Sequence, residues 1–106
     1  MMRLLRFGTG FSENEYDGIR ERFGSLWQRL KSFEPGQVDM ELSVKDRDDK
    51  EQRVTLELWA PGWPKLVATS TRTDLDHALS EVRDDMIRQV DDTKTRREPA
   101  NNRQLR

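Results

Sequence analysis

The spacing of apolar residues changes twice along this chain of 106 residues, and this change constrains the fold more than any other feature. In 13–32 and in 75–96 apolar residues recur at steps of three and four, the period of a helix with one buried stripe. Between these stretches they recur at every second residue, the period of a strand with one buried face. The segments with the shorter period are 38–44, 53–58 and 66–71.

Capping signals bound both predicted helices. Ser12 precedes the first helix with Glu15 three residues later, a capping box in which each side chain satisfies an orphan backbone N–H. Thr73 and Asp76 stand in the same relation before the last helix. The sequence Glu-Pro-Gly at 34–36 ends the first helix, because proline cannot continue its hydrogen-bond ladder.

A short apolar-basic run at 3–7, followed by Gly-Thr-Gly, adds a first strand. The charged segment 45–51 joins the next two strands as an antiparallel hairpin. The predicted order is β-α-β-β-β-α, an α+β fold in which a four-stranded sheet carries two helices packed side by side on one face. We expect one domain over 1–97 and a disordered basic tail over 98–106.

The composition excludes several functional classes. There is no cysteine, so disulfides and thiolate metal sites are excluded, and neither a signal peptide nor a membrane helix is indicated. His77, the single histidine, has no metal-ligand spacing, and the chain has no nucleophile–base set and no glycine-rich phosphate loop. We therefore expect a cytoplasmic protein without enzymatic activity, cofactor, membrane partner or small-molecule substrate.

The formal net charge is −1, so binding to nucleic acid depends on local concentration of bases. Acids outnumber bases from Arg72 to Thr93, whereas from Lys94 onward bases dominate and only Glu98 opposes them. The distribution of charge is thus more informative than its sum.

Several local sequences, in their order, resemble one known family. They read IRERFGSL at 19–26, MELSV at 40–44, RVTLEL at 53–58, LVATS at 66–70, TDL at 73–75, AL at 78–79 and RQ at 88–89. At this spacing, over about Arg3 to Arg97, they resemble the ribosome hibernation-promoting factors, also called ribosome-associated inhibitors or sigma-factor modulation proteins. The chain ends soon after the last helix, so the resemblance is to a divergent short form of the family.

The resemblance implies a translation inhibitor rather than an enzyme. In the family, a basic helical surface contacts ribosomal RNA in the channel of the small ribosomal subunit where messenger and transfer RNA would lie. The implied partners are the small subunit and its ribosomal RNA, and we expect the protein itself to be a monomer. Because phosphate contacts release counterions, binding should weaken steeply with salt.

The resemblance also implies the residues that would contact RNA. Arg22 on the first helix, and Arg88 and Lys94 on the last, occupy positions where the family has bases. Neighbouring bases that could compensate for missing ones are Arg20, Arg29, Lys31, Arg83, Arg96 and Arg97.

The same comparison shows departures from the family. Ser25, Gln28, Asp85 and Asp92 stand where the family usually has lysine or arginine. An acid at a phosphate-contacting position adds repulsion, so these replacements lower the expected affinity.

Other functions remain open at this stage. A divergent relative could have lost ribosome binding and act as a protein-interaction module, and helices on one side of a small sheet also suit general binding of duplex RNA. Trp59 and Trp63 could stack on exposed bases, although covering the sheet is the simpler interpretation.

Overall fold

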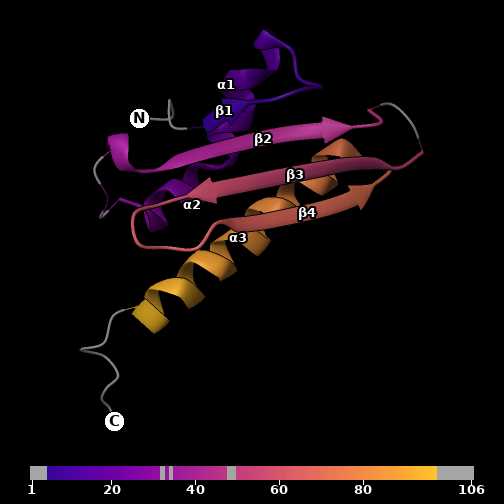
Figure 1. The fold of residues 1–106 in the computed structure, drawn as a ribbon. Helices are drawn as coiled ribbons and strands as arrows, with labels where there is room; N and C mark the ends of the chain where they lie inside the picture. Colours follow the sequence, from indigo (N-terminus) through magenta and orange to yellow (C-terminus); the bar gives the residue numbers. More distant parts are fainter. Residues whose placement is uncertain (1–4, 32, 34, 48–49, 98–106) are drawn as a thin grey trace.

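The computed structural model describes residues 5–31, 33, 35–47 and 50–97, and the fold within them is a single sheet covered by helices (Figure 1). The elements in chain order are β1 (Leu5–Phe7), α1 (Glu13–Arg22), α2 (Gly24–Arg29), a 3₁₀ turn (Pro35–Gln37), β2 (Asp39–Lys45), β3 (Gln52–Trp59), β4 (Leu66–Arg72) and α3 (Leu75–Arg97). The α+β class and the order of the strands agree with the prediction from spacing.

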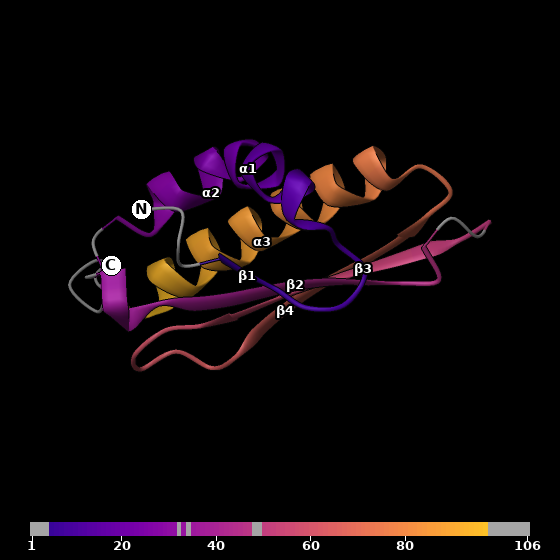
Figure 2. The same ribbon diagram turned by 90° about the horizontal axis from the view of Figure 1, so that it is seen from above.

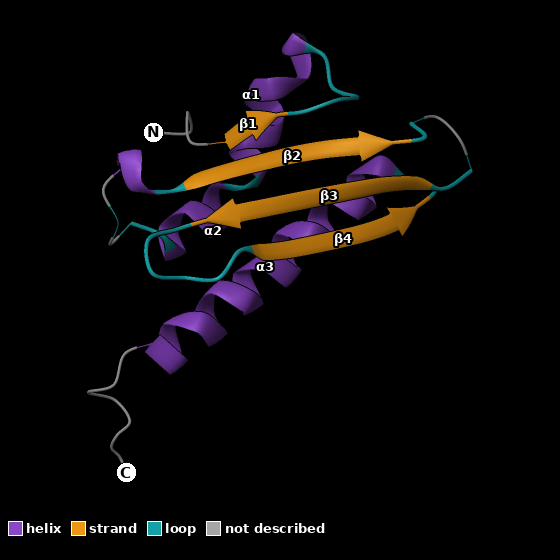
Figure 3. Ribbon diagram, viewed as in Figure 1, coloured by secondary structure: helices purple, strands orange, loops and turns teal. Residues whose placement is uncertain are grey.

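The four strands form one mixed sheet in the order β1-β2-β3-β4 (Figure 3). β1 pairs parallel to β2, as expected for two strands joined through helices, and the other neighbours are antiparallel. The register places Met40 opposite Leu58 and Leu56 opposite Ala68. Buried residues alternate with partly or fully exposed ones along β2, β3 and most of β4, which confirms the predicted hairpin and the predicted inward set of these three strands.

All helices lie on one face of the sheet (Figure 2). The core between the layers includes Leu56 of β3, Phe23 and Leu26 from the first helical region, and Val82 and Met86 of α3, each without exposed surface. Among the residues that the structure describes, no helix covers the other face of the sheet. This confirms the predicted architecture, in which the apolar stripes of the helices cover the inward face of the strands.

The first helical region differs from the prediction, because it is two helices rather than one. Phe23 separates α1 from α2 with backbone angles φ −93° and ψ 13°, and its N–H is shared between the carbonyls of Ile19 and Arg20, both at 3.2 Å. Gly24, which follows, has the low helix propensity of glycine. The periodicity continues across the break because Leu26 remains buried, so the spacing alone could not reveal it.

The cap of α3 also differs from the prediction. Asp74, and not Thr73, supplies the capping side chain: its carboxylate accepts a hydrogen bond from the N–H of Asp76 at 3.1 Å. The carbonyl of Thr73 instead accepts a 2.6 Å hydrogen bond from the Gln52 amide. At α1 the expected partner is present, since Glu15 accepts from the N–H of Ser12 at 2.9 Å.

Two expectations concern residues outside the described ranges. The first strand was predicted from residue 3, and β1 is described from Leu5. The predicted disordered tail, 98–106, likewise lies outside the described residues.

We predict that Phe23→Ala lowers the free energy of unfolding by about 3–5 kcal/mol, since a fully buried phenyl ring is replaced by a cavity at the junction of α1 and α2. Urea denaturation followed by circular dichroism measures the change. The control is Val67→Ala on the uncovered sheet face, where the side chain is 43% exposed and the cost should stay below about 1 kcal/mol. Equal costs for the two variants would contradict the assigned core.

Candidate nucleic-acid interface

The candidate RNA-binding residues all belong to the helical layer. Arg20 and Arg22 are on α1, Arg29 is on α2, and Arg83, Arg88, Lys94, Arg96 and Arg97 are on α3. The fold therefore brings them to one side of the molecule. The side chain of Arg97 lies outside the described part of the structure.

Arg22 and Arg83 connect α1 to α3. The Arg22 guanidinium donates to the Asp76 carboxylate and to the Ser80 hydroxyl, both at 3.3 Å. Arg83 donates to the carbonyl of Arg22 at 3.4 Å and pairs with Asp84 at 2.9 Å. The side chains of Arg22 and Arg83 are only 33% and 26% exposed. Both arginines therefore hold two helices together, which sequence reasoning did not reveal.

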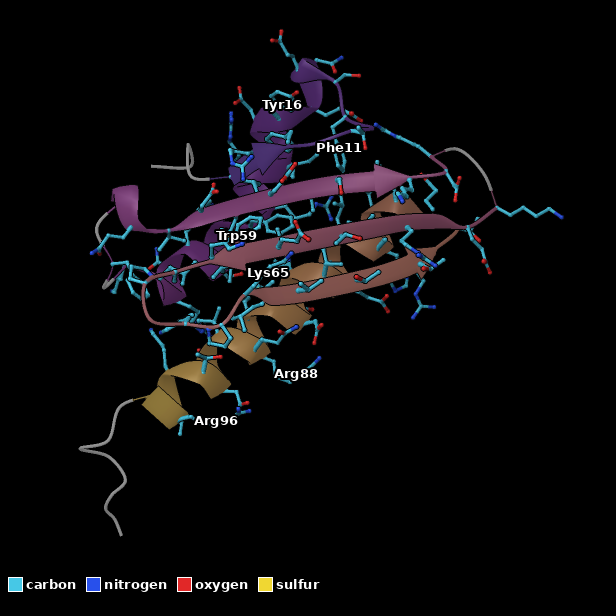
Figure 4. All side chains as sticks on the ribbon, in the orientation of Figure 1. Phe11, Tyr16, Trp59, Lys65, Arg88 and Arg96 are labelled. Atoms are coloured by element: carbon cyan, nitrogen blue, oxygen red, sulfur yellow. The ribbon has the colours of Figure 1, made fainter. Side chains whose placement is uncertain are left out.

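Arg88 and Arg96 differ from this pair because both project from α3 into solvent (Figure 4). Each side chain is 74% exposed and forms an ion pair within its own helix, Arg88 with Asp85 at 2.7 Å and Arg96 with Asp92. Such exposed pairs stabilise a protein by only about 0–1 kcal/mol. Their geometry leaves the guanidinium groups accessible to another anion.

The two acids that depart from the family pattern are thus the partners of these arginines. Asp85 also accepts a 3.1 Å hydrogen bond from Gln89, whose amide donates to the carbonyl of Val67 at 2.8 Å. Each aspartate neutralises the charge of a neighbouring arginine that is a candidate RNA contact. The departures from the family pattern therefore act directly on the predicted binding site.

The remaining candidates have distinct surroundings. Arg29 pairs with Asp91 at 3.3 Å and so joins α2 to α3. Arg20 lies over the stacked rings of Phe7 and Tyr16, and its Nε is buried without a hydrogen-bond partner in the described structure. Lys94 is partly buried, and within the described residues it forms no ion pair.

The tryptophans occupy two different environments. Trp63 packs edge-to-face on Phe33 with the ring centroids 5.2 Å apart, and both rings cover the core. Trp59 ends β3, and the guanidinium of Arg6 and the ammonium of Lys65 lie 5.9 and 5.4 Å from its ring (Figure 4). Trp63 therefore covers the core. The ring of Trp59 already contacts two cationic side chains of the same chain.

Two further ion pairs join separate elements of the chain. Arg47 donates to Glu15 at 2.8 Å and thereby ties the β2–β3 turn to α1, which lowers the pKa of Glu15 to about 2. Arg72 donates to Glu81 at 2.9 Å, linking β4 to α3, and with a second hydrogen bond from Ser70 it lowers the pKa of Glu81 to about 2. Sequence reasoning missed both pairs because their members are 32 and 9 residues apart.

Comparison with known proteins gives a match in structure only. No model of a known protein family matches the chain, and no curated protein matches it either. The N-terminal domain of protein Y from Thermus thermophilus superposes with a TM-score of 0.59 over 81% of this chain and 90% of that one, at 17% sequence identity. The fold is that of the protein Y N-terminal domain.

A second solved structure supports the protein Y fold. A ribosomal subunit interface protein from Coxiella burnetii matches with a TM-score of 0.53, covering 86% of this chain and 97% of that one at 12% identity. Both matches span nearly the whole of the known domains.

Neither a membrane-spanning helix nor a metal site is found among the described residues. Among their helices, none combines the length and the apolar character that crossing a membrane requires. Within the same ranges, no three histidine, aspartate or glutamate side chains are grouped so that they could hold a metal ion.

We predict that the pairs of Glu15 and Glu81 make stability depend on pH. Both pKa values lie below the ordinary 4.5, so the stabilisation is complete above about pH 4.5 and disappears as the pH falls toward 2. The double variant Glu15→Gln/Glu81→Gln should unfold at lower urea concentration than the parent at pH 7, and the difference should shrink near pH 2.

The control for this experiment is Glu51→Gln, at an exposed residue that forms none of the ion pairs of the described structure. A difference between parent and double variant that is the same at both pH values would contradict the assignment.

Proposed function

We propose that this protein binds the small ribosomal subunit through phosphates of its ribosomal RNA and keeps the subunit from translating. The carrying observation is the shared fold: a ribosomal subunit interface protein has the same sheet and helical layer over nearly its whole length. The candidate RNA-binding bases gather on the helical side of that fold. Binding in the channel for messenger and transfer RNA is the specific form of the proposal.

The exposed arginines of α3 support this proposal energetically. Arg88 and Arg96 are held only by short-range pairs on their own helix, which are weak in water. A phosphate bound by arginine forms stronger, charge-assisted hydrogen bonds and releases counterions from the RNA. At low salt each of these arginines should therefore exchange its aspartate partner for a phosphate of the RNA. The displaced aspartate then turns into solvent.

We predict that the purified protein co-sediments with small ribosomal subunits at about 50 mM salt and is released at a few hundred millimolar, as expected for binding dominated by phosphate contacts. Pelleting through a sucrose cushion across a salt series measures this. Large subunits alone serve as the comparison. Failure to pellet with small subunits at the lowest salt overturns the proposal.

We predict that restoring the family's charge strengthens binding. Asp85→Lys and Asp92→Lys, made singly, each remove a repulsive carboxylate and release an arginine, so affinity for the small subunit should rise on the order of tenfold at low salt. Glu51→Lys makes the same charge change at an exposed residue before β3 and is the matched control. An equal gain from Glu51→Lys would show that only net charge matters.

A second candidate function is protein interaction without ribosome binding. The observation that favours it is the internal pairing of six described arginines on the helical layer, namely Arg20, Arg22, Arg29, Arg83, Arg88 and Arg96. A pull-down with and without ribonuclease separates the two functions. If ribosomal components are captured and ribonuclease abolishes their capture, ribosome binding is supported. If a protein partner is still captured after ribonuclease treatment, protein interaction is supported.

A further inference from the structure

Charge is distributed unevenly along the helical layer, from one end to the other. One end, here called the basic end, consists of residues 24–31 and 88–97. Its bases are Arg29, Lys31, Arg88, Lys94, Arg96 and Arg97, and its acids are Asp91 and Asp92. The acidic end consists of residues 13–23 and 74–87, where Arg20, Arg22 and Arg83 are outnumbered by aspartates and glutamates.

The tertiary structure keeps the two ends apart. Arg22, at the close of α1, contacts Asp76 and Ser80 in the first turns of α3. Arg29 of α2 contacts Asp91, much nearer the end of α3. Figure 2 accordingly shows α2 alongside the C-terminal half of α3. A helix of 23 residues is roughly 35 Å long, several times the Debye length of about 8 Å at physiological salt, so each end presents its own field.

Ion pairing sharpens this separation instead of removing it. At the acidic end each of the arginines has an acid partner, and among the described residues the acids left without an ion pair include Glu13, Glu21 and Asp74. At the basic end the described basic side chains without an ion pair are those of Lys31 and Lys94. The surplus charge is therefore negative at one end and positive at the other.

The shape of the molecule exposes the basic end further. In Figure 1 the C-terminal part of α3 runs past the edge strand β4, and Arg88 and Arg96 project from that part in Figure 4. The C-terminal part of α3 can therefore contact a phosphate backbone while the acidic end remains at a distance from it.

We infer that only the basic end contacts RNA, through its phosphate backbone, and that the acidic end stays away from it. This inference rests on the proposed function and divides its candidate residues into two groups. Arg29, Arg88, Lys94 and Arg96 are RNA contacts together with Lys31, another of the compensating bases of the first helical region. Arg20, Arg22 and Arg83 serve the packing of α1 against its neighbours. The protein thus binds RNA in one orientation along its helical layer.

Neutralising single bases at the two ends tests the division. The variants Arg88→Gln, Lys94→Gln and Arg96→Gln represent the basic end, and Arg83→Gln is the matched change at the acidic end. The probe is a plain A-form RNA duplex with a fluorescent label, and anisotropy at several salt concentrations gives affinity and salt dependence. The same proteins are pelleted with small ribosomal subunits, and thermal unfolding verifies that each variant is folded.

We expect each basic-end variant to weaken duplex binding by roughly threefold to tenfold and to reduce the slope of log affinity against log salt by about 1. Arg83→Gln should change affinity by less than about twofold and leave the slope unaltered. Equal losses from Arg83→Gln and Arg88→Gln overturn the inference and leave the proposed function standing if pelleting persists. Duplex binding that depends on the basic end, without pelleting, supports the inference and overturns the proposed function. Binding to neither probe overturns both.

Discussion

Burial of one face of the sheet beneath the helices is the interaction on which the rest of this structure depends. A chain of this length can form only one modest core. In this core Val54, Leu56 and Leu58 of the interior strand β3 have no exposed surface. Phe23 and Met86 of the helical layer belong to the same buried cluster as these strand residues. Positions on the outer side of the helices are consequently free to change without cost to the core. This explains how proteins only 17% and 12% identical to this chain share its fold.

That freedom makes the outer surface the place where function is encoded. The same residue type has two roles on it. Arg22, which is two-thirds buried, joins α1 to α3, whereas Arg88 is 74% exposed and paired only within its helix. Because Arg22 is fixed by contacts to a second helix, whereas an exposed pair within one helix contributes little and exchanges readily with water, the two arginines are not equivalent as binding groups. Position in the fold decides which bases can serve a partner.

Local patterns predicted what depends on local chemistry. Alternation in 38–44 and 53–58 identified β2 and β3, because a sheet with one covered face requires a period of two. The break at Phe23 escaped prediction because the apolar stripe continues through it, and the cap at Asp74 escaped because Thr73 offered an equally good local signal. For the candidate site, the list of bases came from the sequence, but the contacts of Arg22, Arg29 and Arg83 depend on which helix lies beside them.

The sequence by itself determined the order of helical and extended segments, the inward faces of β2, β3 and β4 and the sign of charge along every segment, because these follow from the order of residue types. Only the tertiary structure decided that β1 pairs parallel to β2, that α2 lies beside the second half of α3, and that Glu15 meets Arg47 across the layer. Such pairings join residues far apart in the chain, and their choice depends on how all the apolar faces are buried together. The same packing places the bases of 24–31 beside the basic end of α3, so that the helical layer as a whole has one acidic and one basic end.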